Sequence, residues 1–363
     1  MESDLKLFID KLAGRNSGRP THLLRLSPAE RQQLSRIERD AVRFLAIDSP
    51  AALCRYLNVP FHEVEQCINQ PRYNVLHVHK RNGKGKRLIE EPSMSLKKIQ
   101  SMLNRGLGAV YGLIHPEQVH GFVRSVKGKN IGIVSNASVH AGSPFILNLD
   151  LKDFFHSVPA SRVKQLLSSE LFHFNEHIAT ALALLTTVNG RLPQGASTSP
   201  VLSNFACIPL DDTLTRFAES RGWSYSRYAD DLTFSGSTAF TDDDLSAIRN
   251  LIENEGFRMN DRKTRRKSSS RKQKVTGLIV NKKVNVERKL IRKVRAMLHD
   301  ARINGVESAA HRHFQRVADR GSTKYLNRLR GYVSFIGNVR GLEDPIYLRY
   351  RGQLRELFEE PLV

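Results

Sequence analysis

The chain has 363 residues, with 57 Lys and Arg against 36 Asp and Glu, so its formal net charge is +21. Hydrophobic residues make up 40%, which suffices for a packed core, and the longest weakly polar run, 178–188, is too short to cross a bilayer. The N-terminus lacks the order of a signal peptide, and the three cysteines have no metal-like spacing, which excludes a disulfide scaffold and indicates a reduced cytosol. The charge indicates a polyanionic partner such as nucleic acid, but it does not separate a passive binder from an enzyme.

The first part of the chain is predicted to be helical. Apolar residues recur at helical spacing from Leu34 to Phe44, and a second helix is expected over 51–68. Residues 73–79 then alternate as a strand, and the basic turn 81–87 leads to a strand at 88–89.

The middle of the chain mixes helices with a buried strand. Helices are expected over 94–114, within 159–187 and over 201–218. Between the first two, the apolar run 144–150 predicts a buried strand that ends on the carboxylate of Asp150.

Two further strands are predicted around a pair of acids. The runs 223–228 and 232–235 flank Ala229-Asp230-Asp231, which is a hairpin pattern with acids at its tip. A helix is expected over 242–255.

The C-terminal part is strongly basic. Residues 262–299 hold 15 Lys or Arg and a single acid, Glu287. Helices are predicted over 286–303 and through 306–363. A solvated charged face would explain such a run, but a groove for duplex or structured RNA explains it better.

The placement of three acids points to chemistry. Carboxylates at the ends of buried strands are costly unless they are paired or bind metal. If Asp150, Asp230 and Asp231 converge, they can hold Mg²⁺ ions, and two such ions stabilise the attacking and leaving oxygens of a phosphoryl displacement. The simpler interpretation is that Asp230 and Asp231 only form a turn.

Three segments together resemble the palm motifs of reverse transcriptases, in the same order along the chain. They are 145–158, 192–200 and Tyr228-Ala229-Asp230-Asp231. The resemblance implies that Asp150, Asp230 and Asp231 form the catalytic, metal-binding triad, with two Mg²⁺ ions expected.

The same resemblance assigns the residues that meet the incoming nucleotide. Phe155 lies where the family has an aromatic steric gate against a 2′-hydroxyl, and Gln194 and Gly195 would line the pocket. Arg87, with Lys86 as the second choice, would contact the phosphates, which a guanidinium matches bidentately. The alternatives are a core role for Phe155 and a solvated turn for the basic pair.

Two further segments resemble retron reverse transcriptases in particular. Asn136-Ala137-Ser138-Val139-His140 matches a retron signature, and 275–280 matches the Val-Thr-Gly signature at the primer-grip position. The resemblance implies a set of RNA- or primer-binding residues: Asn136, His140, Val275, Thr276, Gly277, Arg288, Lys289, Arg292 and Lys293. A satisfied structural histidine and a simple turn are the alternatives for His140 and Gly277.

Residues 260–264 resemble the next motif of the family, in which Lys263 would donate a proton to the leaving pyrophosphate. The alternative is that Lys263 is one more cation in a basic run. The segment 123–135 is longer than the family pattern, which indicates an extended fingers loop.

The expected fold is α+β, a right-hand polymerase with fingers, a palm built on an antiparallel sheet, and a helical thumb. A helical N-terminal extension is expected at 1–50, fingers and palm at 51–284, and an RNA-binding thumb at 285–363. The resemblance covers roughly residues 50–340 and leaves the first 50 without a role.

The resemblance implies a cytoplasmic bacterial RNA-directed DNA polymerase that uses deoxynucleoside triphosphates. Its template would be a structured non-coding RNA, priming would come from a guanosine 2′-hydroxyl, and the product would be the branched RNA–DNA of retrons. An effector protein and a role in anti-phage defence are implied as well, and no membrane partner. The alternatives are another bacterial reverse transcriptase, of a group II intron-like or phage-exclusion type, and a non-catalytic RNA-binding scaffold; the lack of a maturase-like or endonuclease extension argues against an intron enzyme.

Overall fold

The computed structural model describes residues 34–79, 85–123, 130–314 and 321–359. The chain divides into two compact units: unit 1 is Met1–Gly132, Leu147–Phe234 and Phe240–Arg266, and unit 2 is Ile133–Ile146, Ser235–Ala239 and Lys267–Val363. Parts of four sequence predictions lie outside the described residues, namely most of the N-terminal extension, the tip of the basic turn 81–87, part of the loop 123–135, and 315–320 and 360–363 within the predicted C-terminal helices.

Unit 1 begins with helices and a two-stranded ribbon. These elements are α3 (Arg36–Leu45), α4 (Pro50–Leu57), α5 (Phe61–Asn69), β1 (Tyr73–His79), β2 (Lys86–Pro92) and α6 (Met94–Ile114). A capping box starts α3, because the Ser35 and Glu38 side chains each accept from the other's backbone N–H.

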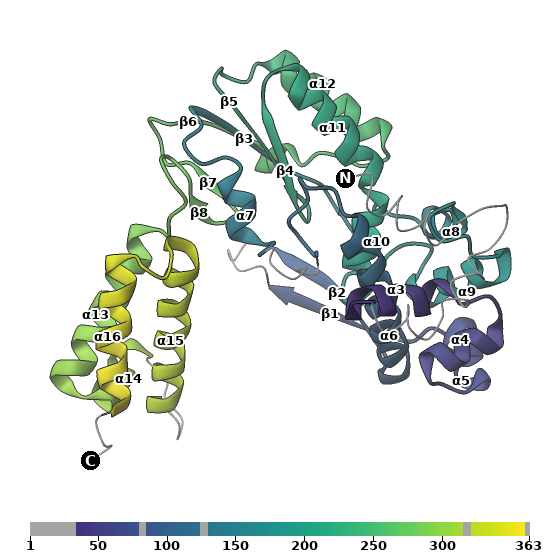
Figure 1. Cartoon of the computed structure of the whole chain (residues 1–363), viewed down its shortest axis with the longest axis horizontal. Helices are drawn as coiled ribbons and strands as arrows, with labels where there is room; N and C mark the ends of the chain where they lie inside the picture. The colour runs from purple at the N-terminus through teal and green to yellow at the C-terminus, as the bar shows by residue number, and fades with distance from the viewer. Residues whose placement is uncertain (1–33, 80–84, 124–129, 315–320, 360–363) are drawn as a thin grey trace. The chain divides into compact units, whose positions relative to one another are not determined.

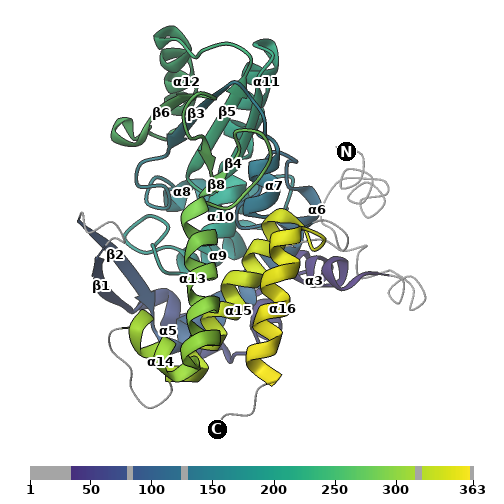
Figure 2. The same ribbon diagram turned by 90° about the vertical axis from the view of Figure 1, so that its left-hand side faces the viewer.

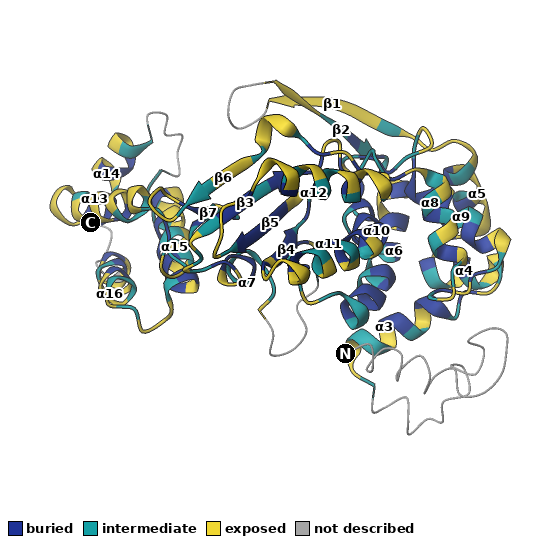
Figure 3. Ribbon diagram, turned by 90° about the horizontal axis from the view of Figure 1, so that it is seen from above, coloured by how far each residue is buried: buried dark blue, intermediate teal, exposed yellow. Residues whose placement is uncertain are grey.

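A four-stranded sheet and the helices around it make up the rest of unit 1, except that the strand residues 145–146, 235–236 and 267–268 belong to unit 2. In chain order these elements are β3 (Phe145–Asp150), α8 (Ala160–Ser168), α9 (Glu176–Thr186), α10 (Ser199–Ala206), α11 (Ile208–Ser220), β4 (Ser224–Tyr228), β5 (Asp231–Gly236), α12 (Asp242–Asn254), the short 3₁₀ helix η2 (Asp261–Lys263) and β6 (Arg265–Ser268). The strand order is β4-β5-β3-β6, with β3 and β5 in the middle (Figure 2). These two strands are largely buried (Figure 3), and the predicted α+β fold is confirmed.

Two predicted helices are each divided in the structure. The helix expected over 51–68 is α4 and α5, because Asn58 takes a left-handed conformation (φ 51°) and Pro60 cannot donate a backbone hydrogen bond. The helix expected over 201–218 is α10 and α11, which meet at Cys207 ahead of Pro209. Local breakers, rather than the apolar spacing, set these boundaries.

Strands β1 and β2 pair antiparallel from Tyr73↔Pro92 to His79↔Lys86, which confirms the predicted strands on either side of the basic turn. All of β1 after Tyr73 is exposed (Figure 3), including Val75 and Val78. The buried half of the ribbon is the end of β2, where Glu90 and Pro92 lie.

The helical layer of unit 1 packs on a buried aromatic ring. Phe44 of α3 is fully buried, and its ring contacts Tyr56, Phe172 and Phe174. A Cβ on Gly106 would lie 2.5 Å from the Phe44 Cγ, so α6 needs glycine here to approach α3.

A fully buried ion pair links the β4–β5 hairpin, which carries two of the three predicted acids, to helix α11. Arg227 on β4 donates from Nε and Nη2 to the two carboxylate oxygens of Asp211 on α11, at 2.8 and 2.7 Å. Its Nη1 donates to Asn204 Oδ1 and to the carbonyl of Ala229 in the β4–β5 turn. Every polar arm of this arginine therefore has a partner, as a buried charge requires.

Unit 2 is mostly helical. Its elements are α7 (Ile133–Ser138), β7 (Lys274–Val275), β8 (Leu278–Ile279), α13 (Arg288–Asn304), α14 (Val306–His313), α15 (Gly321–Arg340) and α16 (Pro345–Glu359). The last four helices lie side by side in Figures 1 and 2 around a core that includes Met297, Tyr325 and Ile336. In the ranges that the structure describes, no helix is both long and apolar enough to span a membrane.

The buried ion pair gives a test of the fold. Asp211→Asn leaves the Arg227 charge buried without its carboxylate, so we expect the free energy of unfolding to fall by about 3–5 kcal/mol in urea titrations. Asp212→Asn is the control, because the neighbouring Asp212 pairs with Arg216 at the exposed surface and should cost less than about 1 kcal/mol. Equal losses in the two variants would contradict this account.

Candidate active site

The structure brings the three predicted acids to one edge of the sheet. Asp150 ends β3, Asp230 lies in the two-residue turn between β4 and β5, and Asp231 begins β5, the neighbour of β3. The backbone N–H of Leu151 donates to the carbonyl of Asp230 at 2.9 Å, which fixes the two strand ends together. Ala229 makes the turn tight with a left-handed φ of 58°.

Asp150 is buried, and its carboxylate is held from the next segment of the chain. Lys263 Nζ donates to Oδ1 at 2.5 Å, and Asn260 Nδ2 donates to Oδ2 at 3.0 Å. The backbone N–H of Asn260 also donates to the Asp150 carbonyl at 2.8 Å, so this segment is in register with the end of β3.

The three aspartates at this edge of the sheet repel one another, and Lys263 attracts them. Burial, and then the negative charge of Asp150, raise the pKa of Asp230. Desolvation of the carboxylate, together with the like charges of Asp230 and Asp150, raises the pKa of Asp231 to about 7, although part of the residue is exposed. Burial alone would lower the pKa of Lys263, but its contact with Asp150 outweighs this and raises it, so Lys263 stays protonated.

These acids fit a divalent cation that is shared with a substrate. Within the described ranges, no three acidic, histidine or cysteine side chains lie together as a complete set of ligands that could by itself hold a metal ion. Mg²⁺ rarely needs one, because it usually takes one or two carboxylates and completes its shell with water and phosphate oxygens. A cation would also relieve the mutual repulsion that raises the pKa of Asp230 and Asp231.

Three of the predicted nucleotide-binding residues, Arg87, Gln194 and Gly195, lie where strand β2 meets the loop after Leu192. With its side-chain amide oriented to suit its neighbours, Gln194 accepts from Arg87 Nε at 3.3 Å and donates to the Leu88 carbonyl at 3.1 Å. Gly195 has a φ of 150°, and a Cβ on it would lie 2.5 Å from the Glu90 carbonyl oxygen. Strand β2 and the Gln194-Gly195 loop are therefore in direct contact.

Phe155 is half-buried and contacts aromatic rings on two sides. Its centroid lies 5.5 Å from Phe154 and 6.1 Å from Phe122. Phe122 has 43% of its surface exposed and a left-handed φ of 58°, a strained conformation for an aromatic residue. The preceding Gly121 lies against the β4–β5 turn, since a Cβ there would be 2.4 Å from the Ala229 nitrogen.

The retron-like signature residues of unit 2 come together around α7, β7 and β8. Asn136, His140 and Val275 are buried, and His140 Nδ1 forms a hydrogen bond of 2.8 Å with Ser235 Oγ. Their side chains lie in the interior of unit 2, and a contact of these residues with RNA or primer stays a prediction. The same contact is predicted for Thr276 and Gly277, which turn between the strands with φ of 47° and 82°.

The basic residues predicted on α13 share an exposed face. Arg288, Lys289, Arg292 and Lys293 are exposed, while Val294 on the same helix is buried. Lys293 Nζ also donates to the Tyr332 hydroxyl at 3.0 Å and lies over its ring.

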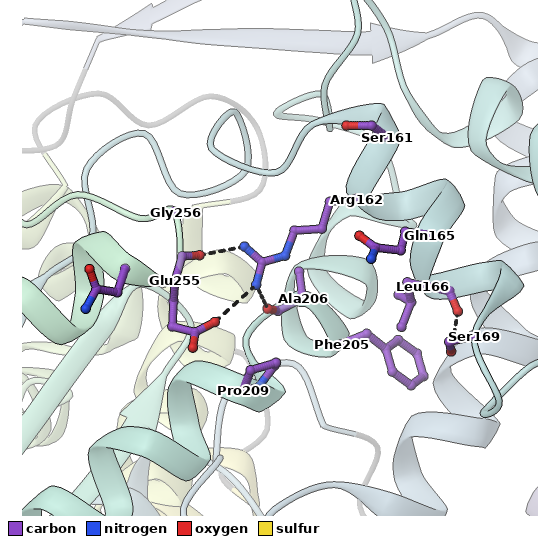
Figure 4. A pocket seen from close by; sticks show the side chains of 11 residues that line it. Ser161, Arg162, Gln165, Leu166, Ser169, Phe205, Ala206, Pro209, Glu255 and Gly256 are labelled. Atoms are coloured by element: carbon purple, nitrogen blue, oxygen red, sulfur yellow. Dashed lines mark hydrogen bonds and ion pairs between the residues drawn. The ribbon is translucent and has the colours of Figure 1, made fainter.

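A pocket of about 590 Å³ in unit 1 is lined by other residues (Figure 4). At its centre, Arg162 donates to the carbonyls of Glu255 and Ala206 at 2.6 and 2.7 Å. Because backbone carbonyls already accept from both Arg162 amino groups, we interpret Arg162 as a structural residue that connects the C-terminal ends of α10 and α12. None of the predicted site residues lines this pocket.

The sequence interpretation did not assign roles to Asn260, Glu90 and Phe122. Asn260 begins the 260–264 motif, and its spacing to Lys263 could have indicated a shared role. Glu90 and Phe122 carried no signal, because their partners lie far away in the chain.

Comparisons with known proteins identify the family that the chain resembles. The family model described as reverse transcriptase (RNA-dependent DNA polymerase) matches residues 78–280. The retron Ec86 reverse transcriptase of Escherichia coli is 31% identical over 290 residues, which are 79% of this chain and 82% of the relative. The retron Mx65 reverse transcriptase of Myxococcus xanthus is 37% identical over 278 residues, 68% of this chain. The chain spans only 60% of the length of that relative. Among solved structures, telomerase from Candida albicans in complex with a TWJ fragment of telomeric RNA aligns with a TM-score of 0.44 and 11% identity, over 79% of this chain and 63% of that one.

The close approach at Gly195 predicts a defect for a single methyl group. Gly195→Ala would place a Cβ 2.5 Å from the Glu90 carbonyl, so we expect the loop to shift and DNA synthesis to fall at least about tenfold in primer extension. Gly132→Ala is the control, since a Cβ there meets nothing within 4 Å. Full activity of Gly195→Ala would show that the loop position is unimportant.

Proposed function

The chain belongs to the family of retron reverse transcriptases, and from this premise we propose that it synthesises DNA on an RNA template from deoxynucleoside triphosphates. The observation that carries the proposal is the convergence of Asp150, Asp230 and Asp231 at one sheet edge, within the family match at 78–280. A scaffold that only binds RNA has no need for three mutually repelling carboxylates.

We assign these three aspartates as the residues that hold Mg²⁺, with two ions expected. When bound, such ions stabilise the attacking and leaving oxygens of an in-line phosphoryl displacement. Asn260 orients the Asp150 carboxylate through its 3.0 Å hydrogen bond. Lys263 is the candidate general acid, because its amine is held beside the metal-binding acids by a 2.5 Å hydrogen bond to the Asp150 carboxylate and would face the leaving pyrophosphate.

The nucleotide pocket is assigned to Arg87, Phe155, Gln194 and Gly195. Arg87 presents a guanidinium to the phosphates and is linked to Gln194, while Gly195 lets β2 and the loop approach closely. Phe155 would exclude a 2′-hydroxyl, and the contact with Phe122 would stiffen this gate.

We further assign the fingers and palm to 51–284 and the RNA-binding thumb to 285–363, after a helical extension at 1–50. The exposed basic face of α13 supports binding of structured RNA through phosphates, with Thr276 and Gly277 as the primer-grip candidates.

The retron relatives support a more specific proposal. The template would be a cognate structured RNA, primed from a guanosine 2′-hydroxyl, and the product would be branched multicopy single-stranded DNA. We propose that the protein acts in the bacterial cytoplasm, in anti-phage defence with an effector protein.

The catalytic assignment is tested by Asp150→Asn and Asp230→Asn. Each variant removes a metal-binding charge, so we expect Mg²⁺-dependent primer extension on a generic RNA template to be lost, by at least about a thousandfold. Binding of the RNA, measured by filter retention, should change little, because the substitutions leave the exposed Lys and Arg residues of α13 unchanged. Full synthesis by either variant would refute the assignment, and an inactive parent enzyme would favour the scaffold alternative.

The retron assignment is tested by the product made in cells. We expect the gene, expressed with its flanking DNA, to yield a discrete single-stranded DNA that resists RNase and shifts in size after debranching enzyme. The Asp230→Asn gene is the control and should yield none. Linear products alone would favour another bacterial reverse transcriptase class.

A further inference from the structure

Glu90 is a buried carboxylate at the inner end of β2, with only 3% of its surface exposed. It lies outside the residues assigned to the metal and nucleotide sites. A charged group in such a place is destabilising unless several partners compensate it. Its partners therefore indicate what the charge is for.

Four donors from two other segments converge on this one side chain. Arg191 donates from Nη1 to Oε2 and from Nη2 to Oε1, at 3.0 and 3.1 Å, as a bidentate pair. His156 Nε2 lies 3.0 Å from Oε2, and the backbone N–H of Gln194 donates to Oε2 at 3.2 Å. Burial opposes the charge, but these contacts outweigh it and lower the pKa of Glu90, so it stays ionised.

The backbone repeats the same link. The N–H of Glu90 donates to the Gln194 carbonyl at 2.8 Å, and Gly195 packs on the Glu90 carbonyl. Strand β2 and the Gln194 loop are thus joined by a side-chain and a main-chain hydrogen bond, and each segment supplies one of the two donors.

Each joined segment adjoins an assigned nucleotide-binding residue. Arg87 precedes Glu90 by three positions on β2, Phe155 adjoins His156, and Gln194 belongs to the loop itself. Small displacements of such groups have large kinetic effects, so the element that sets their spacing matters for the reaction.

We propose that Glu90 is a positioning residue of the nucleotide pocket, whose carboxylate fixes Phe155 and Gln194 relative to Arg87. This inference rests on the proposed polymerase function. It predicts that Glu90 controls the affinity for the incoming nucleotide and the preference for a deoxyribose.

A second buried pair in the same unit provides a matched control. Asp40 on α3 is 5% exposed and accepts two hydrogen bonds from Arg105 on α6, at 2.8 and 2.7 Å. Neither residue belongs to a segment assigned to nucleotide binding. Asp40→Asn therefore removes a comparable buried charge without touching the pocket.

The test compares Glu90→Gln with Asp40→Asn in single-nucleotide extension. We expect Glu90→Gln to raise the KM for the deoxynucleotide about tenfold or more and to reduce the preference over the ribonucleotide, with a smaller change in kcat. Asp40→Asn should leave KM and preference unchanged. Unchanged values in Glu90→Gln, or equal changes in the two variants, would overturn the proposal.

Folding is followed in parallel through the fluorescence of Trp223, the single tryptophan. If Glu90→Gln unfolds at a lower temperature than Asp40→Asn, the same kinetic measurements are made on Arg191→Lys. This variant keeps the positive charge next to Glu90 but loses the bidentate contact. We expect it to shift KM and sugar preference in the same direction, and no shift would overturn the proposal. An inactive parent enzyme would instead refute the proposed polymerase function.

Discussion

Like charges gathered at one place repel, and much of unit 1 serves to hold three aspartates together against that repulsion. Neutral backbone hydrogen bonds fix the positions, from Leu151 to the Asp230 carbonyl and from Asn260 to the Asp150 carbonyl. The ammonium of Lys263 compensates part of the charge. The backbone hydrogen bonds persist whichever carboxylates are ionised, whereas the Lys263 ion pair requires an ionised Asp150.

The acidic site could be predicted because each acid ends a local apolar pattern, and the motifs around it are continuous in sequence. The burial of His140 could not be predicted, because its partner Ser235 lies 95 positions away in the chain. Glu90 is a similar case, because Arg191 is 101 positions away. Helix existence was predictable from periodicity, whereas the break at Cys207 depended on single residues. Local sequence patterns therefore do not predict polar contacts between residues that are far apart in the chain.

The net charge of +21 combines two kinds of basic residue. Arg105, Arg191 and Arg227 are bound to carboxylates inside unit 1 and neutralise particular buried acids. The residues on α13 are exposed and leave their charge to solvent or to a polyanion. The excess available for nucleic acid is therefore concentrated in the second kind, and total charge alone does not locate it.

The hydrogen bond from the Glu90 N–H to Gln194 has a consequence for solubility. Since β1 occupies one side of β2, this N–H points to the other, where an unpaired strand edge would invite another chain to add to the ribbon. The loop occupies that position with a single carbonyl. The loop at Gln194 thus also covers this part of the β2 edge, so we expect variants that loosen the loop to be more prone to aggregate.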